Sequence, residues 1–514
     1  MNLGLTRRNI GRLVLLTWAV MLAWLARREF AKGGSAGVAE RTRQLEPGAQ
    51  YFAVLAAGRQ VGLANLSVDT VPEGVRLREQ LVFDLPFGDS TRQLARGAEY
   101  LISRALRLRH YTRTEFGIGP PERLDAALGA DSILELSGTE GSDVKTGRVR
   151  LRVDPEAILP AMLPYRAAFG RHLRVGEVFT LPLIEIATGT TRRLEVRVAA
   201  ESTFIVPDSA VWDSAGGQWV AAPSDTIQAW RLDHDATGTP TRSWVDAGGA
   251  LLRQESAGGV TLQSSAFELV LNNYRRARRT ESSAWRRAIP GMIGLAARRR
   301  RPDTAASYRD FLILADSSTG LSGMSRALQG GRQTLRHDTL RVWRDTPSET
   351  APDDPRMALG PAWDLPVLDD AMHDLATQVL ARAKTGADSA RTLTLWVARQ
   401  VVTDTESTAS GTAISTLRIH HGSPDAKARL LVTLARTKLI PARVVTGLAV
   451  LPQGVFAHTW AELWLGRWIA ADPTYGDFPA SAALVRIAVG GRSRPVDLLP
   501  LVGSARFLPL RVPR

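Results

Sequence analysis

The sequence predicts an α+β protein in which a mostly antiparallel β domain precedes a smaller mixed domain. Between residues 48 and 272, apolar and polar residues alternate in short runs that are separated by glycine-containing turns. This pattern is typical of antiparallel strands. Between residues 365 and 490, two amphipathic helical stripes are followed by a capped helix and a strand hairpin. With 514 residues, the chain is long enough for two or three domains with their own cores.

The β domain opens with three alternating runs, at residues 51–55, 61–69 and 75–84, which we expect to form an antiparallel meander. Later alternations predict further strands, at residues 149–153, 194–198, 229–232, 243–246 and 260–263. No catalytic constellation is visible in this part of the sequence. We therefore expect the β domain to pack or to bind rather than to catalyse.

Residues 273–364 read as a basic connector and linker that contains one strand, at residues 308–315. Arginines are dense between residues 274 and 301, and they carry much of the net charge of +14. This segment could lie on anionic headgroups or could be a solvated connector, and both interpretations stay open. No nucleic-acid-binding module is visible, so we expect no nucleic-acid partner and attribute the charge to a solvated basic surface.

The N-terminus contains an apolar run over residues 10–28 with arginines at both ends. A transmembrane helix needs roughly 20 residues, and flanking arginines can extend a short span by snorkelling. A cleaved signal peptide is the alternative, but Trp24 and Leu25 make a poor small-residue cleavage site. We therefore predict a cytoplasmic tail and signal anchor over residues 1–28, a tether over residues 29–47, and a single-pass protein whose bulk is extracytoplasmic.

Two helical stripes lie at the start of the mixed domain. Each stripe places four apolar residues on one helix face, namely Leu368, Met372, Leu375 and Val379, then Leu393, Trp396, Val397 and Val401. Stripes of this kind are more often core than ligand sites.

The next segment reads as the start of a helix that is stabilised by its own sequence. Ser423 is a good N-cap residue, Pro424 fits the first helical position, and Asp425 lies near the positive end of the helix dipole. Apolar residues then follow at helical spacing to about residue 436. Two strands around Gly466 come next, at residues 456–465 and 467–471.

The order of motifs from residue 419 to residue 474 resembles a transglutaminase-like domain, which is related to papain. The matching motifs are Gly422-Ser423-Pro424-Asp425-Ala426, Ile440-Pro441-Ala442-Arg443, His458-Thr459-Trp460-Ala461-Glu462 and Asp472-Pro473-Thr474. Leu439 stands where a glycine is usual in the family. The resemblance implies that Asp472 accepts a hydrogen bond from His458 and orients its ring. The layout is similar to that of membrane-anchored bacterial proteins, which implies a bacterial inner membrane and a periplasmic body.

The resemblance also implies that Pro424 occupies the position of the family's catalytic cysteine, and the chain contains no cysteine at all. A cysteine there would supply the nucleophile and an oxyanion-hole N–H. Proline supplies neither group. The lack of cysteine also excludes disulfides and thiolate metal sites. We expect no cofactor and no metal, because His420 and His421 are adjacent and would point in opposite directions on a strand.

Three functions follow from this pattern. The first is a membrane-anchored pseudoenzyme that binds a peptide or a glycan-peptide of the cell wall, with Trp460 and Trp468 lining its site or packing in its core. The second is an active peptidase, amidase or acyltransferase that uses Ser423 with His458 and Asp472. The third is a structural envelope scaffold. The sequence does not specify an oligomeric state.

Overall fold

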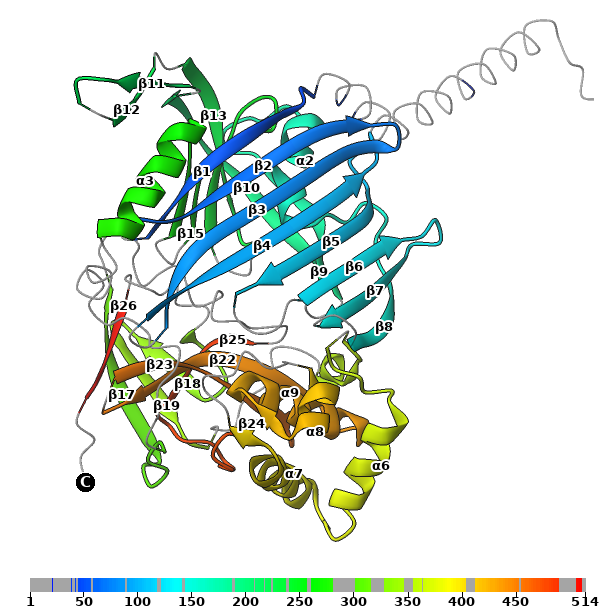
Figure 1. Ribbon diagram of the computed structural model, residues 1–514. Coiled ribbons are helices and arrows are strands. Elements are labelled where there is room, and N and C mark those ends of the chain that lie inside the picture. Colours follow the sequence, from blue (N-terminus) through cyan, green and yellow to red (C-terminus); the bar gives the residue numbers. More distant parts are fainter. Residues whose placement is uncertain are drawn as a thin grey trace, which may run out of the picture.

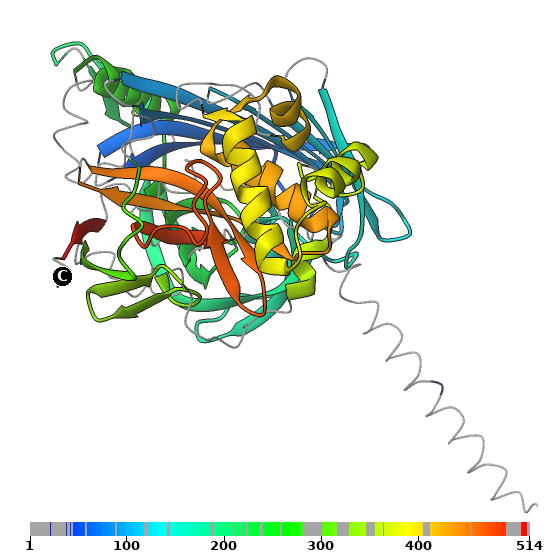
Figure 2. The same ribbon diagram turned by 90° about the horizontal axis from the view of Figure 1, so that it is seen from below.

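The computed structural model places most of the chain in two β-rich units, which lie beside each other in Figures 1 and 2. Apart from single residues 21, 38 and 42, the structure describes residues 45–56, 59–87, 90–117, 122–140, 144–186, 190–207, 209–216, 218–222, 225–236, 240–256, 260–280, 301–315, 328–345, 355–362, 364–403, 412–452, 454–489 and 505–510.

The first unit is one large antiparallel sheet with fourteen strands among the described residues. It appears in blue to green in Figure 1. From edge to edge the order is β8 (Val144–Arg152), β7 (Ile133–Glu140), β6 (Glu122–Leu128), β5 (Leu108–Phe116), β4 (Ser90–Ile102), β3 (Gly74–Phe87), β2 (Arg59–Val71), β1 (Gly48–Ala56), β16 (Val260–Ser265), β15 (Leu251–Ser256), β14 (Thr241–Val245), β13 (Asp225–His234), β10 (Thr190–Val206) and β9 (Val178–Glu185). A separate hairpin, β11 (Ala210–Asp213) with β12 (Gln218–Ala221), leaves the sheet between β10 and β13.

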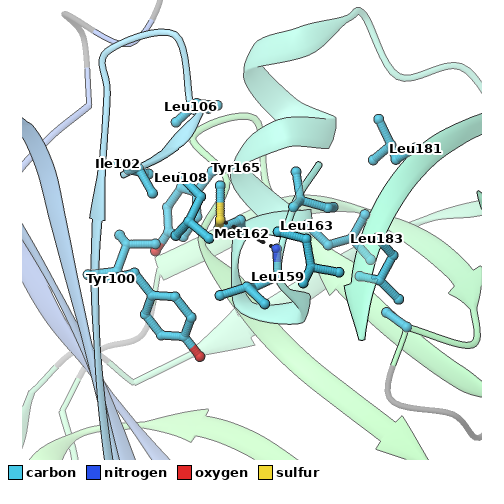
Figure 3. Close-up of a cluster of buried hydrophobic side chains, with 14 of the residues drawn as sticks. Tyr100, Ile102, Leu106, Leu108, Leu159, Met162, Leu163, Tyr165, Leu181 and Leu183 are labelled. Carbon is cyan, nitrogen blue, oxygen red and sulfur yellow. Dashed lines mark hydrogen bonds between the residues drawn. The ribbon is translucent and has the colours of Figure 1, made fainter. Parts of the chain in front are cut away.

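A short helical segment fills part of the inner face of this sheet. It comprises η2 (Pro160–Met162) and α2 (Leu163–Gly170). Figure 3 shows Met162 and Tyr165 of this segment among Tyr100 and Ile102 of β4 and Leu108 of β5, and all five are buried. Alternation along each strand brings these apolar side chains to one face.

The second unit contains two four-stranded antiparallel sheets and a group of helices. The central sheet has the order β24 (Trp468–Ala471), β23 (Gly454–Trp464), β22 (Ala442–Leu451) and β25 (Leu484–Val489). The other sheet has the order β18 (Gln333–Arg336), β19 (Thr339–Trp343), β17 (Tyr308–Ala315) and β26 (Ala505–Pro509). The helices are η3 (Pro355–Leu359), α6 (Asp370–Val379), α7 (Gly386–Gln400), α8 (Ala413–Ile419) and α9 (Pro424–Thr437), and β20 (Val402–Thr403) pairs in parallel with β21 (His421–Gly422).

One face of the central sheet has two neighbours. Ala461 and Leu463 of β23 share a core cluster with Leu431 and Leu434 of α9. Further along, Leu448 and Val450 of β22 pack with the other sheet. The opposite face packs around Trp460 with the segment that precedes β25. Helix α9 therefore lies in the core, which explains why its residues are almost all buried.

The strands expected at residues 51–55, 61–69, 75–84 and 308–315 are confirmed as parts of β1, β2, β3 and β17. The strands expected at residues 149–153, 194–198, 229–232, 243–246 and 260–263 coincide, to within a residue at an end, with parts of β8, β10, β13, β14 and β16. The predicted domain boundaries stay a prediction.

Two details differ from the sequence analysis. Helix α3 (Phe267–Thr280) packs on β1 and β2 and buries Tyr274, although residues 273–280 were assigned to the connector. The helix starts directly after β16, and the apolar residues in its first turns pack on the sheet, so the helix continues into the arginine-rich residues. Leu368 precedes α6 and is exposed, so Met372 and Ala376 form the buried stripe of that helix instead.

The predicted signal anchor at residues 10–28 lies outside the described residues, apart from Met21. Among the helices that the structure describes, none is long and apolar enough to cross a membrane.

Helix α9 ends in a Schellman motif. The N–H of Leu439 donates to the carbonyl oxygen of Arg436, and the N–H of Ile440 donates to that of Ala435. This geometry requires a left-handed residue after the helix, and Leu439 adopts φ 58° there with 77% of its surface exposed. Leucine thus takes the backbone conformation that glycine usually supplies.

We expect Leu439→Gly to stabilise the protein by about 0.5–1 kcal/mol, because glycine adopts the left-handed conformation without the steric cost that a Cβ atom adds. Chemical denaturation of the two proteins measures the difference. Leu439→Ala is the matched control, since it removes the exposed side chain and keeps the Cβ atom. A stability of Leu439→Gly equal to that of Leu439→Ala would contradict the argument.

Candidate functional site

The start of α9 is built as the sequence predicts. Ser423 is the N-cap residue, and its side-chain oxygen accepts a hydrogen bond from the N–H of Ala426 at 3.3 Å. Pro424 occupies the first turn, where a missing N–H has no cost. Within the described part of the chain, Ser423 makes no hydrogen bond to His458. Its side-chain oxygen caps the helix.

His458 and Asp472 form a buried pair on the central sheet. His458 lies in β23, Asp472 follows β24, and the Nε2 atom of the histidine is 2.8 Å from Oδ2 of the aspartate. Each side chain is 1% exposed. The other carboxylate oxygen accepts a hydrogen bond from the N–H of Thr474 at 2.9 Å. Burial acts to raise the pKa of Asp472, but His458 and the hydrogen bonds outweigh it and lower that pKa below its usual value.

Two aromatic rings enclose the imidazole of His458. The ring of Trp460 stacks with it at a centroid distance of 6.2 Å, and the ring of Tyr475 lies 5.9 Å away. Gly447 is the cross-strand partner of His458, and a Cβ atom there would come within 2.7 Å of the Trp460 ring. The close packing of β22 under this ring therefore requires glycine.

The two tryptophans predicted as substrate contacts are core residues in this structure. Trp460 is completely buried, and Trp468 is 5% exposed. Trp468 lies under the guanidinium of Arg443 at 3.9 Å. Core packing, the other interpretation of these residues, accounts for both positions. A ligand would have to displace other side chains before it could contact either ring.

Alternation along β23 decides where the pair lies relative to α9. His458 and Trp460 project from one face, whereas Ala461 and Leu463 project from the other face and pack against the helix. The turn after Asp472 contacts α7, where a Cβ atom on Gly476 would come within 3.2 Å of Ala398. The body of α9 is therefore on the opposite side of the sheet from His458.

Asp425 does not point its charge at the pair. Its carboxylate binds the buried guanidinium of Arg429, with one oxygen at 2.6 Å and the other at 2.9 Å. Arg429 also lies 3.4 Å from Asp364, which precedes α6. The negative charge of Asp425 is therefore compensated locally by Arg429.

A second charged group is buried beside the pair. The carboxylate of Glu462 accepts hydrogen bonds from the guanidinium of Arg443 at 2.6 and 2.8 Å. Burial acts to raise the pKa of Glu462, but the charges of Arg443 and Arg486 lower it below its usual value. Arg332 enters from the loop before β18, donates to the carbonyl oxygens of Ala480, Ser481 and Leu484, and lies 5.8 Å from the Trp460 ring.

Lys427 is a buried amine that sequence reasoning missed. Its Nζ atom donates to the carbonyl oxygen of Val401 at 2.8 Å and to the hydroxyl of Thr403 at 3.0 Å, and so closes the end of α7. Burial lowers the pKa of Lys427 to about 8, while the charge of Asp472 acts in the opposite direction. Lys427 and Arg332 carry no local sequence signal, because the partners of each lie far away in the chain.

The histidine doublet forms no metal site. His420 ends α8 with a left-handed φ of 54°, and its Nδ1 atom lies 3.2 Å from the carbonyl oxygen of Gln400. His421 begins β21. Over the part of the chain that the structure describes, no group of three potential ligands is arranged to hold a metal ion.

We expect the stability of the protein to rise between pH 8 and pH 10.5 because of Lys427. Its folded pKa of about 8 lies below the ordinary value of 10.5, so the unfolded chain holds more protons in this window and folding gains with pH. Relative to Lys427→Met, the wild type should gain roughly 2–3 kcal/mol between pH 7.5 and pH 10.5. Urea denaturation at both pH values measures this difference, and an unchanged difference would show that the amine titrates normally.

Comparison with known proteins matches part of the chain to a family model. Residues 373–473 match the model of the transglutaminase-like superfamily. The search of curated proteins finds no match. These residues include α7, α8, α9 and the His458–Asp472 pair.

Three solved structures are similar to parts of the chain. A candidate cysteine protease from Cytophaga hutchinsonii is 22% identical, with a TM-score of 0.24, over 41% of this chain and 77% of that protein. A β-barrel-like protein of a domain of unknown function from Brucella abortus is 11% identical, with a TM-score of 0.27, over 43% and 95%. A candidate protease from Parabacteroides distasonis is 10% identical, with a TM-score of 0.18, over 78% and 70%.

TM-scores this low carry no argument about the whole chain. The family match covers the segment that contains α7, α8, α9 and the buried pair. The chain thus contains a transglutaminase-like domain over residues 373–473.

Proposed function

We propose that this transglutaminase-like domain performs no cysteine-dependent acyl transfer and acts as a binding module. The observation that carries the proposal is the start of α9. Pro424 stands in the first turn, and the family resemblance assigns that position to the nucleophile. Proline offers no side-chain nucleophile and no backbone N–H. The loss of one oxyanion donor alone typically costs about 3–4 kcal/mol of transition-state stabilisation.

Neighbouring groups do not restore the missing chemistry. Ser423 lies one position earlier, and its oxygen accepts the N–H of Ala426 as an N-cap. A serine nucleophile also needs a base within hydrogen-bond reach. His458 directs Nε2 to Asp472 and stacks between two aromatic rings, with 1% of its side chain exposed. The alternative of a Ser423 hydrolase therefore receives no support from this geometry.

We assign the ligand to the class that the resemblance implies, an extended peptide or a glycan-peptide of the bacterial cell wall. The predicted anchor at residues 10–28 would hold the protein at the inner membrane with this domain on the extracytoplasmic side. A purely structural scaffold is the competing function. Binding of cell-wall fragments to the purified full-length protein, measured by calorimetry, distinguishes the two.

We expect no peptidase, amidase or amine-incorporation activity above background from the full-length chain. The reason is that Pro424 carries no nucleophile and that the Ser423 oxygen serves as the N-cap of α9. The same assays on His458→Ala and Ser423→Ala supply the controls, and neither substitution should change the result. Turnover that disappears in either variant would contradict the proposal and would indicate a working site.

We expect Pro424→Cys to create a thiol with a pKa below about 8.5, because the N-terminus of a helix stabilises a thiolate. The chain has no cysteine, so the introduced thiol is the only one that can be labelled. The pH dependence of its alkylation by iodoacetamide gives the pKa.

Lys438→Cys is the matched control for this measurement. It places a thiol at the other end of α9, where the helix dipole disfavours the thiolate. The pKa at position 438 should equal or exceed the ordinary value. Equal pKa values at the two ends would show that the helix start no longer favours an anion.

A further inference from the structure

The turn from Asp472 to Asp477, called here the 472–477 turn, covers the buried pair. Its ends exchange two backbone hydrogen bonds, from the N–H of Asp472 to the oxygen of Asp477 at 2.9 Å and in the reverse direction at 3.0 Å. Between them, Tyr475 places its ring 5.9 Å from the His458 ring. The turn therefore carries both the partner of His458 and one of the rings that enclose it.

Arg301 ties this turn to a distant part of the chain. Its guanidinium forms an ion pair with Oδ1 of Asp477. The next residues pack at the same place, since Pro302 is buried and the carbonyl oxygen of Asp303 accepts the Ser481 hydroxyl at 2.5 Å. The side chain of Arg301 is 59% exposed, whereas that of Asp477 is 5% exposed. The cation is thus accessible from solvent, and its anionic partner is not.

The buried carboxylate of Asp477 needs a positive charge beside it. Its Oδ2 atom is buried without a hydrogen-bond partner among the described residues. Arg301 is its ion-pair partner, and Asp472 adds a second buried negative charge close by. Removal of one partner from a buried ion pair leaves an uncompensated charge, which is strongly unfavourable. Movement of the turn into water would relieve that cost.

We propose that Arg301 is a latch which holds the 472–477 turn closed over His458. While the ion pair is intact, Tyr475 covers the imidazole and the pair is closed to solvent. When Arg301 leaves, the turn moves outward to hydrate Asp477, and it takes Tyr475 with it. The role of the latch in ligand access rests on the proposed binding function of the site. The effect of the latch on the solvent exposure of His458 does not depend on that function.

The test measures how fast diethyl pyrocarbonate modifies His458 in the full-length protein at neutral pH. Peptide mass spectrometry identifies the modified histidine, and the exposed His420 and His421 serve as internal references. Arg301→Gln should raise the rate at His458 by about tenfold or more, because a buried site reacts only through opening. Arg341→Gln is the matched control, since it removes an exposed arginine that pairs with Asp310.

A double variant keeps the proposal falsifiable if Arg301→Gln is destabilised in general. Asp477→Asn removes the buried charge, so Arg301→Gln with Asp477→Asn should protect His458 again to near the wild-type rate. A general loss of stability would instead leave the double variant at least as reactive as Arg301→Gln. A wild-type rate in Arg301→Gln, or no recovery in the double variant, overturns the latch. Cell-wall fragment binding by the same proteins tests the function separately.

Discussion

The buried negative charge of Asp472 is the constraint on which the rest of the site depends. A carboxylate that is 1% exposed is tolerable only when hydrogen bonds and opposite charges surround it. His458 and the N–H of Thr474 provide the hydrogen bonds. The charge also acts on Lys427, Arg332 and Arg301. These cations come from three separate segments, so one carboxylate links α9, the loop before β18 and the end of the arginine-rich stretch 274–301.

Both members of the His458–Asp472 pair are needed to satisfy buried polar groups. Loss of either member would leave a buried polar group unpaired, which is more costly than keeping both. The pair is therefore part of the core, enclosed by Trp460 and by the turn that carries Tyr475. A His–Asp pair that a sequence motif indicates can thus stabilise a core, and the packing around the histidine shows this role.

Much of the fold follows from local sequence, and most of the site does not. Alternation predicted β1 to β3, and the Ser423-Pro424 pattern predicted the start of α9, because both are short-range effects. The family resemblance supplied the His458–Asp472 hydrogen bond. Two facts escaped prediction, namely the role of Arg332 and the contact of Arg301 with Asp477. Each of these contacts joins residues that are more than a hundred positions apart in the chain. No local sequence pattern indicates such a contact.

The residues at the start of α9 stabilise their own helix. A catalytic thiolate at a helix N-terminus uses the unpaired N–H groups and the dipole of the helix to stabilise charge during reaction. In this chain, the Ser423 oxygen accepts a hydrogen bond from one of those N–H groups, and Pro424 lacks another. Asp425 adds a carboxylate whose charge Arg429 compensates. Each residue satisfies the helix in its resting state. Capping and the ion pair with Arg429 thus stabilise the first turn of α9 in the folded protein.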